Sequence, residues 1–181
     1  AIYSGSFVTL AKAEFSKSSD VRQNKWSYYI KGDPARQEVL KTALEWVSDS
    51  QETTIDGYMA AHRQDDDIDE LKTYFTTVID WVTARFPGTP RSQMRGLPWG
   101  KFYKTWGQDS YDGDATEKRV KELFGDPTIK AKKNIYQFIL GGEQETQLLD
   151  VRLFDEATKL ATFNEQTEDC LLYTSPSPRD R

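Results

Sequence analysis

A helical hydrophobic period in the middle of the chain places the strongest constraint on its fold. From Ile68 to Phe86 the apolar residues recur at intervals of three and four, and Pro87 and Gly88 end the pattern. The apolar positions are Ile68, Leu71, Phe75, Val78, Ile79, Val82 and Phe86. This spacing puts all of them on one stripe of a helix, so the sequence predicts a core helix over 68–86.

Helical patterns also precede this segment. Asp33 followed by Pro34 has the form of a helix start, because a Pro at the first helical position loses no hydrogen bond. The apolar stripe that follows consists of Val39, Leu40, Ala43, Leu44 and Val47. A second, short helix is predicted from Thr54 to His62, and the acidic run 65–67 then supplies negative charge to the start of the central helix.

Shorter helices are predicted after the central helix. Trp99–Trp106 suits a short helix that carries aromatic anchors, and core packing is the expected role of most tryptophans in the chain. Asp114 and Glu117 have the spacing of a capping box, in which the two side chains satisfy each other's backbone N–H groups at the start of a helix. Another helix is predicted over 128–140, where Gly141 provides the stop signal.

The hydrophobic period changes near the end of the chain. Apolar and polar residues alternate over 148–154, which predicts a short extended segment, and Asp155 then begins a last helix that runs to Gln166. No internal repeat is present at the spacings of solenoid proteins. The predicted fold class is mainly α, an irregular multi-helix domain with one short extended segment before the last helix.

The composition fits one folded domain. The chain has 181 residues, of which 37% are hydrophobic and 13% aromatic, and this is too apolar for a disordered chain. No run approaches about 18 apolar residues and no signal-peptide pattern is present, so we expect no membrane span and a cytoplasmic location. The formal net charge of −5 argues against nucleic-acid binding by the whole surface and leaves room for a local basic patch.

The scarcity of Cys and His limits the chemistry of the chain, which contains only Cys170 and His62. A structural zinc site takes a tetrahedral set of such ligands and cannot be built from them. A Ser-His-Asp triad would have to use His62, which has acidic neighbours on a predicted helix and is typical of a surface His. The acidic cluster from Asp65 to Glu70 lacks the spacing of a calcium loop. We therefore predict no catalytic, cofactor-binding or metal-binding residue here.

Basic residues provide the candidate nucleic-acid contacts, since each Lys or Arg can displace a counterion condensed on DNA. The candidates are Lys130, Lys132 and Lys133. The preceding helix adds positive charge over 118–121. A solvated helical face with paired glutamates explains both groups equally well, so both interpretations stay open. Arg91 and Arg95 form a weaker second patch.

The two ends of the chain differ from the sequence between them. Residues 170–180 read Cys-Leu-Leu-Tyr-Thr-Ser-Pro-Ser-Pro-Arg-Asp and resemble, over eleven consecutive residues, the translation of a common transposase sequencing adapter. We expect residues 170–181 to be an adapter-derived tail, with a native Ser/Pro-rich tail as the alternative. Removing its two Arg and one Asp from totals of 24 and 29 leaves 22 basic and 28 acidic side chains, or −6. Residues 1–10 open without a helix cap, so both ends are expected to be cuts in a longer protein.

Short stretches distributed along nearly the whole chain share a further pattern. They are Lys31–Gln37 with Ala43–Trp46, Tyr58–Ala60, Tyr74–Phe75 with Val78–Trp81, Met94–Tyr103, Ile135–Tyr136, and Val151–Asp155 with Lys159. Together they resemble a bacterial family that joins an N-terminal ParB/sulfiredoxin-like domain to a C-terminal HNH nuclease, among the relatives of GmrSD-type restriction systems. None of the stretches is a catalytic signature, so the resemblance concerns the connecting region of that family.

The resemblance implies where the parts of the parent protein lie. Residues 1–7 look like the end of the N-terminal domain, whereas Lys159, Phe163 and Gln166 look like the helix that leads into the HNH module. Cys170 stands where the family places the first Cys of a zinc pair. The HNH reaction is metal-assisted phosphodiester hydrolysis with a His as general base. The divalent metal and the structural zinc are therefore implied only for a nuclease module that this chain lacks.

The predicted organisation follows from these features. Residues 1–17 are the end of the ParB/sulfiredoxin-like domain, 18–146 the helical connector domain, 147–169 the lead-in to the HNH module, and 170–181 the adapter-derived tail. We predict a fragment of an HNH-type DNA endonuclease of bacterial defence, whose helical part positions the nuclease and contacts DNA. The alternative is a non-enzymatic helical protein-interaction module.

Overall fold

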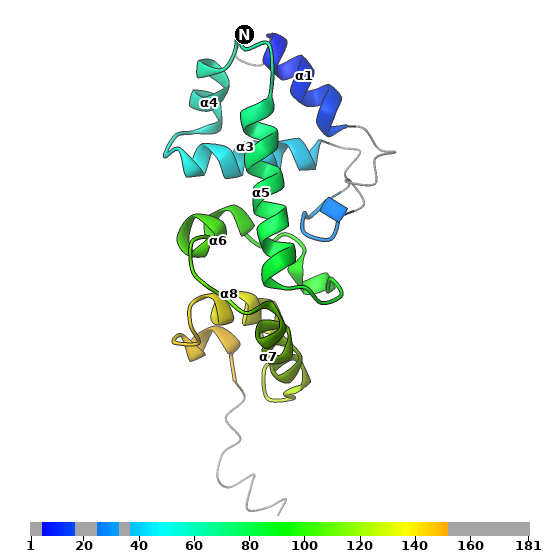
Figure 1. The fold of residues 1–181 in the computed structure, drawn as a ribbon, viewed down its shortest axis with the longest axis vertical. Helices are drawn as coiled ribbons and strands as arrows, with labels where there is room; N and C mark the ends of the chain where they lie inside the picture. The colour runs from blue at the N-terminus through cyan, green and yellow to red at the C-terminus, as the bar shows by residue number, and fades with distance from the viewer. Residues whose placement is uncertain (1–4, 17–24, 33–36, 152–181) are drawn as a thin grey trace, which may run out of the picture.

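The computed structural model describes residues 5–16, 25–32 and 37–151, and within them the fold is built from helices (Figure 1). The α-helices are α1 (Ser6–Phe15), α3 (Glu38–Ser50), α4 (Ile55–Ala61), α5 (Asp69–Arg85), α6 (Trp99–Trp106), α7 (Gly113–Gly125) and α8 (Ile135–Leu140). Three short 3-10 turns are η2 (Ser92–Met94), η3 (Lys132–Asn134) and η4 (Thr146–Leu149). No β-strand occurs in these described ranges, where an isolated bridge joins Ile129 to Val151. The predicted mainly α fold is confirmed.

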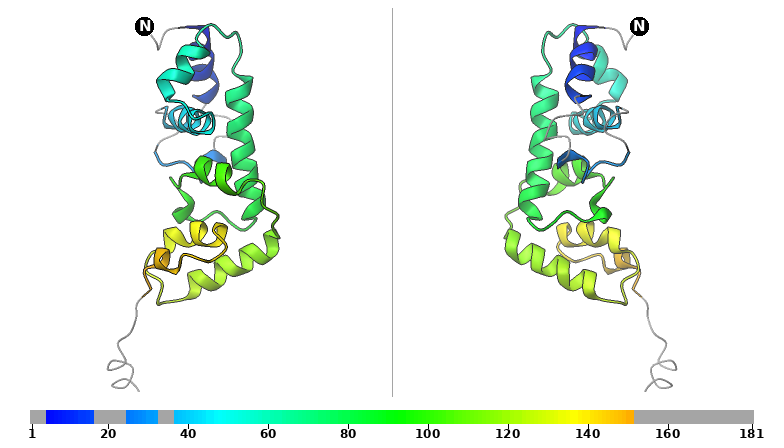
Figure 2. Two further views of the ribbon diagram at one scale, coloured as in Figure 1. Left: turned by 90° about the vertical axis from the view of Figure 1, so that its left-hand side faces the viewer. Right: turned by 90° about the vertical axis from the view of Figure 1, so that its right-hand side faces the viewer.

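Helix α5 is the central element of the fold. It runs along one edge of the molecule, with α1, α3 and α4 stacked beside it and α7 crossing beyond its last turn (Figure 2). Every apolar position of the predicted stripe is buried, which confirms the core helix. Phe75 stacks on Trp46 with ring centroids 5.3 Å apart and meets the edge of Trp26 at 5.0 Å. These tryptophans, together with the buried Trp81, fill the core as predicted.

The two helices before α5 form largely as predicted. The apolar stripe of α3 is buried, but this helix begins at Glu38, because Gln37 has a φ of 64° and cannot continue a right-handed helix. The predicted start at Asp33–Pro34 lies outside the described residues. Helix α4 agrees with its predicted range, and the Thr54 hydroxyl caps it by accepting a 3.0 Å hydrogen bond from the Gly57 N–H.

The segment between α5 and α6 is tied to a turn that lies far away in the sequence. Gly96 donates its N–H to the Tyr29 carbonyl at 2.8 Å from a left-handed conformation with φ 71°, which favours glycine. Arg95 donates to the carbonyls of Ile30 and Gly32 at 3.1 and 2.8 Å. These bonds fix the turn 29–32 beside the start of α6.

Helix α6 is the predicted short helix with aromatic anchors. Trp99 is fully buried and donates its indole N–H to the Met94 carbonyl at 3.0 Å, so this polar group is satisfied inside the core. Gly100 lies directly against Trp46, because a Cβ atom at Gly100 would come within 2.5 Å of the indole Cγ. The absence of a side chain there lets α6 pack closely on α3.

The capping box predicted at Asp114 is wrong. Asp112 is the N-cap of α7, and its carboxylate accepts from the N–H groups of Asp114 and Ala115 at 2.9 and 3.1 Å. Glu117 cannot turn back to the helix start, because its carboxylate pairs with Arg91. The cap therefore lies two residues earlier than the sequence pattern indicates.

The helix predicted over 128–140 is confirmed only in its second half, as α8 begins at Ile135. Asp126 holds the preceding residues in a turn, since its carboxylate accepts from both the N–H and the hydroxyl of Thr128, at 2.8 and 2.6 Å. Ile129 then pairs with Val151 in the isolated bridge instead of forming a helical turn. Contacts with residues distant in sequence have overridden the local pattern here.

The predicted extended segment over 148–154 is described only as far as Val151. Its first residues belong to η4, and Asp150 has a φ of 44°, so the extended part is reduced to the bridge at Val151. The last helix predicted from Asp155 and the tail 170–181 lie outside the described residues.

Helix α1 packs into the same core as the helices that follow it. Phe15 contacts the edge of Phe75 on α5 with ring centroids 5.5 Å apart, and Phe7 contacts Tyr58 on α4 at 6.0 Å. α1 thus shares its hydrophobic contacts with the predicted connector domain. The domain boundaries at 17 and 146 stay predictions.

Candidate nucleic-acid interface

The predicted nucleic-acid contacts lie in the basic segment 130–133, between α7 and α8. Lys130 and Lys133 are exposed and form no ion pair within the described residues. Lys132 differs, because its ammonium group donates to three carbonyl oxygens near the C-terminal end of α7. The acceptors are Leu123 at 3.2 Å, Phe124 at 2.8 Å and Asp126 at 2.5 Å. Lys132 therefore satisfies the free carbonyls of a helix end and has no donor left for a phosphate.

The basic segment is held against the residues that precede the predicted nuclease lead-in. Ile129 forms the bridge with Val151, and the Ala131 N–H donates to the Leu149 carbonyl at 3.2 Å. This backbone hydrogen bond and the bridge together fix the segments 129–131 and 149–151 relative to each other. Lys130 and Lys133 consequently lie beside the first residues of the range 147–169.

The basic residues of α7 divide into paired and unpaired side chains. Arg119 donates to Glu143 at 2.8 and 2.6 Å and to Glu122 at 3.1 Å, and its guanidinium holds the pKa of Glu143 below the usual value. Lys121 lies 4.0 Å from a glutamate of its own helix. Lys118 is exposed and has no ion pair in the described ranges. The interpretation as a solvated, paired face thus fits Arg119 and Lys121.

Arg91 is engaged inside the protein. Its two terminal nitrogens lie 2.6 and 3.4 Å from the two carboxylate oxygens of Glu117, whose side chain is only 9% exposed. This hydrogen bonding raises the pKa of Arg91. The neighbouring Tyr136 hydroxyl is buried, and burial raises its pKa to about 12 against the opposing effect of the Arg91 charge. Arg91 and Arg95 are the two residues of the predicted second basic patch. In the structure, both guanidinium groups hold segments of the fold together.

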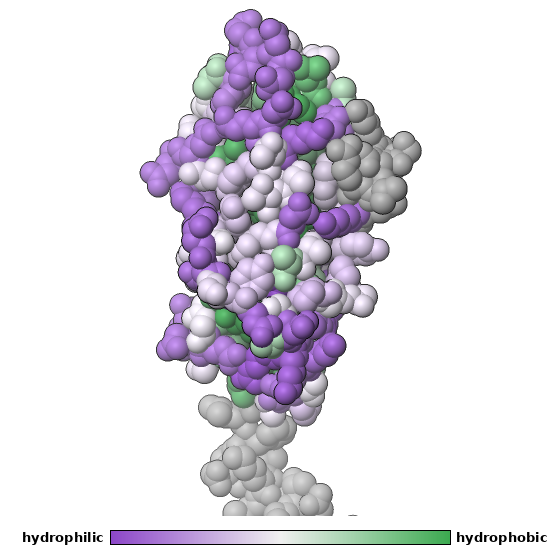
Figure 3. Space-filling model, in the orientation of Figure 1, coloured by the Kyte–Doolittle hydropathy of each residue, from purple (hydrophilic) through white to green (hydrophobic). Residues whose placement is uncertain are grey.

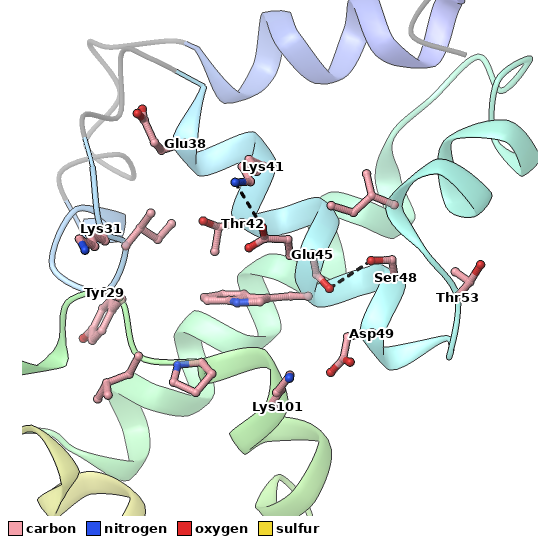
Figure 4. Close-up of a pocket in the computed structure, with 16 residues that line it drawn as sticks. Tyr29, Lys31, Glu38, Lys41, Thr42, Glu45, Ser48, Asp49, Thr53 and Lys101 are labelled. Carbon is pink, nitrogen blue, oxygen red and sulfur yellow. Dashed lines mark hydrogen bonds and ion pairs between the residues drawn. The ribbon is translucent and has the colours of Figure 1, made fainter.

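A groove of about 660 Å³ lies between α3, α6 and the turn 29–32 (Figure 4). This volume is in the range of about 300–1,000 Å³ that small-ligand sites occupy. Its lining includes Tyr29, Trp46 and Pro98. Tyr29, Trp46 and Leu97 are buried, whereas the exposed residues of the lining are mostly polar.

The charges around this groove have opposite signs on its two walls. The acidic residues come from α3 and include Glu45 and Asp49, whereas Lys31 and Lys101 stand on the other wall without an ion pair in the described residues. Lys41 partly offsets the acidic wall, since it lies 3.7 Å from Glu45. This groove was not predicted from the sequence. Its one local signal is the recurrence of charged residues on the polar face of α3.

His62 and the acidic cluster have structural roles where they are described. The His62 Nδ1 lies 2.7 Å from an Asp65 carboxylate oxygen, and the Ser6 hydroxyl donates to the Asp65 carbonyl at 3.1 Å. Asp67 accepts from the Asp69 N–H at 3.1 Å, so one carboxylate of the predicted acidic run lies at the start of α5. No group of three or more His, Cys, Asp or Glu side chains is placed to hold a metal ion in the described residues.

The visible face of the molecule is hydrophilic at both ends and less polar in between (Figure 3). Within the described ranges, no helix is both long enough and apolar enough to cross a membrane. Comparisons with protein-family models, with curated proteins and with solved structures give no match to this chain.

Proposed function

We propose that this chain is the helical, non-catalytic part of an HNH-type DNA endonuclease of a bacterial restriction system, and that its basic segment contacts DNA phosphates. The proposal rests on the sequence resemblance across 31–159 together with one structural observation. That observation is the pair of exposed, unpaired lysines, Lys130 and Lys133, fixed beside the start of the predicted nuclease lead-in.

The proposed contact acts through charge and position. Each ammonium group that approaches the DNA backbone releases condensed counterions, which favours binding without reading sequence. Phosphate contacts fix the orientation of a protein on the duplex, so a contact at Lys130 and Lys133 would orient the residues that follow Val151. In the proposed parent protein, this would direct the nuclease towards the bound DNA in the cytoplasm.

The metals of the HNH reaction do not fit the described residues of this chain. No cluster of His, Cys, Asp or Glu is placed to hold an ion there. The divalent ion and the structural zinc are proposed only for the nuclease module of the parent protein, and no catalytic step is assigned to the residues of this chain.

The test is the salt dependence of DNA binding by the full chain. Fluorescence anisotropy with a short labelled duplex gives the slope of log binding constant against log salt. Because each phosphate contact contributes about 0.9 to this slope, the double variant Lys130→Gln with Lys133→Gln should reduce it by about 1.8. Lys12→Gln provides the matched control, since Lys12 is an exposed lysine of α1. An unchanged slope in the double variant, or an equal reduction in the control, contradicts the proposal.

A non-enzymatic protein-interaction module is the second candidate function. The groove between α3 and α6 favours it, because unpaired charges of both signs line a concave surface that is unrelated to the basic segment. The flanking coding sequence distinguishes the two functions. A Cys-x-x-Cys motif followed by the HNH residues after position 169 supports the nuclease, whereas an in-frame stop shortly after Asp169 supports the module.

A further inference from the structure

Arg85, in the last turn of α5, is a buried cation without a bonded partner. The residue is only 8% exposed, and its Nε and Nη1 atoms are inaccessible to solvent and make no hydrogen bond. No ion pair or hydrogen bond joins any part of its guanidinium to the described residues. Burial lowers the pKa of Arg85, and the nearby charge of Asp109 offsets only part of this effect.

This arrangement is unusual because buried charges are normally paired or hydrogen-bonded. The other arginines near α7 follow that rule, since Arg91 pairs with Glu117 and Arg119 with Glu143. The last turn of a helix favours a cation through its dipole, but this effect supplies no hydrogen-bond acceptor. The N–H groups of Arg85 therefore lack the acceptors that a guanidinium of this burial requires.

Two groups near Arg85 come from the connection between α6 and α7. The guanidinium carbon lies 4.5 Å from the centroid of the Tyr111 ring, which covers one face of the cation. Tyr111 is itself 38% exposed, so it separates Arg85 from solvent. Asp109, on the same connection, acts on Arg85 through its charge and does not form an ion pair with it.

The connection that carries Tyr111 is held mainly at its two ends. At its start, the Gly107 and Asp109 N–H groups donate to the carbonyls of Tyr103 and Trp106 at 2.8 and 3.2 Å. Its other end is the Asp112 cap of α7. The backbone of Ser110 and Tyr111 makes no hydrogen bond within the described residues. Neither α6 nor α7 therefore depends on a backbone hydrogen bond from Ser110 or Tyr111.

We infer that Arg85 is an anchor for a phosphate group and that Tyr111 covers this site when it is empty. One edge of a guanidinium donates two parallel N–H bonds to two oxygens of a phosphate, and the higher charge of a phosphate makes it a stronger acceptor than a carboxylate. The nearby carboxylate of Asp109 does not pair with Arg85, so the described residues leave this guanidinium free to bind a ligand. The site is separate from the proposed DNA contact at Lys130 and Lys133.

The experiment measures thermal unfolding of the full chain in sodium phosphate against sodium chloride of equal ionic strength. A ligand that binds only the folded protein raises the midpoint in proportion to the logarithm of its concentration once its dissociation constant is exceeded. We expect this rise for the wild type with inorganic phosphate and not with acetate. Arg85→Met should abolish it. Arg85→Lys keeps the positive charge but lacks the paired N–H groups of a guanidinium, so it should weaken phosphate binding by about tenfold or more.

Lys12→Met is the matched control, because Lys12 is an exposed lysine on α1 and its loss should leave the phosphate effect unchanged. Tyr111→Leu removes the ring over the site and should strengthen phosphate binding. An equal rise in Arg85→Lys and the wild type would overturn the inference, and so would an equal rise with acetate. If inorganic phosphate has no effect but a DNA duplex raises the midpoint through Arg85, the phosphate is that of a nucleic acid and the anchor stands.

Discussion

Replacing Glu117 by Gln should destabilise the protein far more than a change at a helix surface normally does. The carboxylate of Glu117 is the partner of Arg91, whose guanidinium also lies over the Phe124 ring at 5.1 Å. The substitution keeps the size of the side chain and removes its charge. It leaves Arg91, with a side chain that is 23% exposed, as a largely buried cation without its counter-charge.

The magnitude follows from the burial of the two partners. Breaking a buried ion pair by removing one partner costs roughly 3–5 kcal/mol of the free energy of unfolding. Because Arg91 keeps some contact with water, we expect the lower end, about 3 kcal/mol. Removing both charges with Arg91→Met and Glu117→Gln should cost only about 1 kcal/mol, since no buried charge is left unpaired. The difference corresponds to a coupling of at least about 2 kcal/mol.

Urea unfolding of the full chain, followed by tryptophan fluorescence, measures these values, provided that the denaturant slope stays the same in all variants. Arg119→Met offers a comparison, because Arg119 forms ion pairs that are more exposed. A loss below about 1 kcal/mol in Glu117→Gln, or a double variant that is less stable than both single variants, would refute the assignment of this pair as a buried link between η2 and α7.

Three further changes test individual contacts. Lys132→Met should cost about 1–3 kcal/mol in urea unfolding, because it leaves the carbonyls at the end of α7 without a donor, whereas Lys133→Met should stay within about 0.5 kcal/mol. Asp112→Ala should cost about 1 kcal/mol and Asp114→Ala clearly less, and the reverse order would restore the capping box. Glu143 has a lowered pKa in the folded state, so its contribution is present above the ordinary Glu pKa and is lost as pH falls through the folded value. The stability difference between wild type and Glu143→Gln, measured by urea unfolding from pH 7 to pH 3, should therefore shrink with acidification, and a constant difference would contradict the pairing.

Hydrophobic periodicity was sufficient to predict the helices of the central core. It correctly placed the stripe of α5 and the range of α4, because in these segments local propensity and burial favour the same conformation. It failed over 128–134. The apolar residues there fit a helix, but Ile129 forms a bridge to Val151. Val151 is distant in the sequence, so the pattern around Ile129 does not indicate this pairing.

The candidate sites depended even more on contacts between distant residues. The sequence grouped Lys130, Lys132 and Lys133 by composition, and only the fold separates Lys132, whose ammonium group is bound to the end of α7. The groove could not be predicted, because its lysine wall comes from two segments far apart in the sequence, the turn 29–32 and the start of α6, which are joined through Arg95 and Gly96. The unpaired state of Arg85 was equally hidden, since an amphipathic pattern reports apolar positions and not the absence of an acceptor.

The bonds from Arg95 and Gly96 to the turn 29–32 also bear on how the protein folds. They connect residues separated by 63 to 67 positions, so closing this loop costs considerable chain entropy before any of its contacts is gained. Helices α3, α4 and α5 all lie inside the loop and shorten the path between its ends once they have formed. The Gly96 amide, bonded to Tyr29 at 2.8 Å, should therefore become protected from hydrogen exchange only after these helices have assembled.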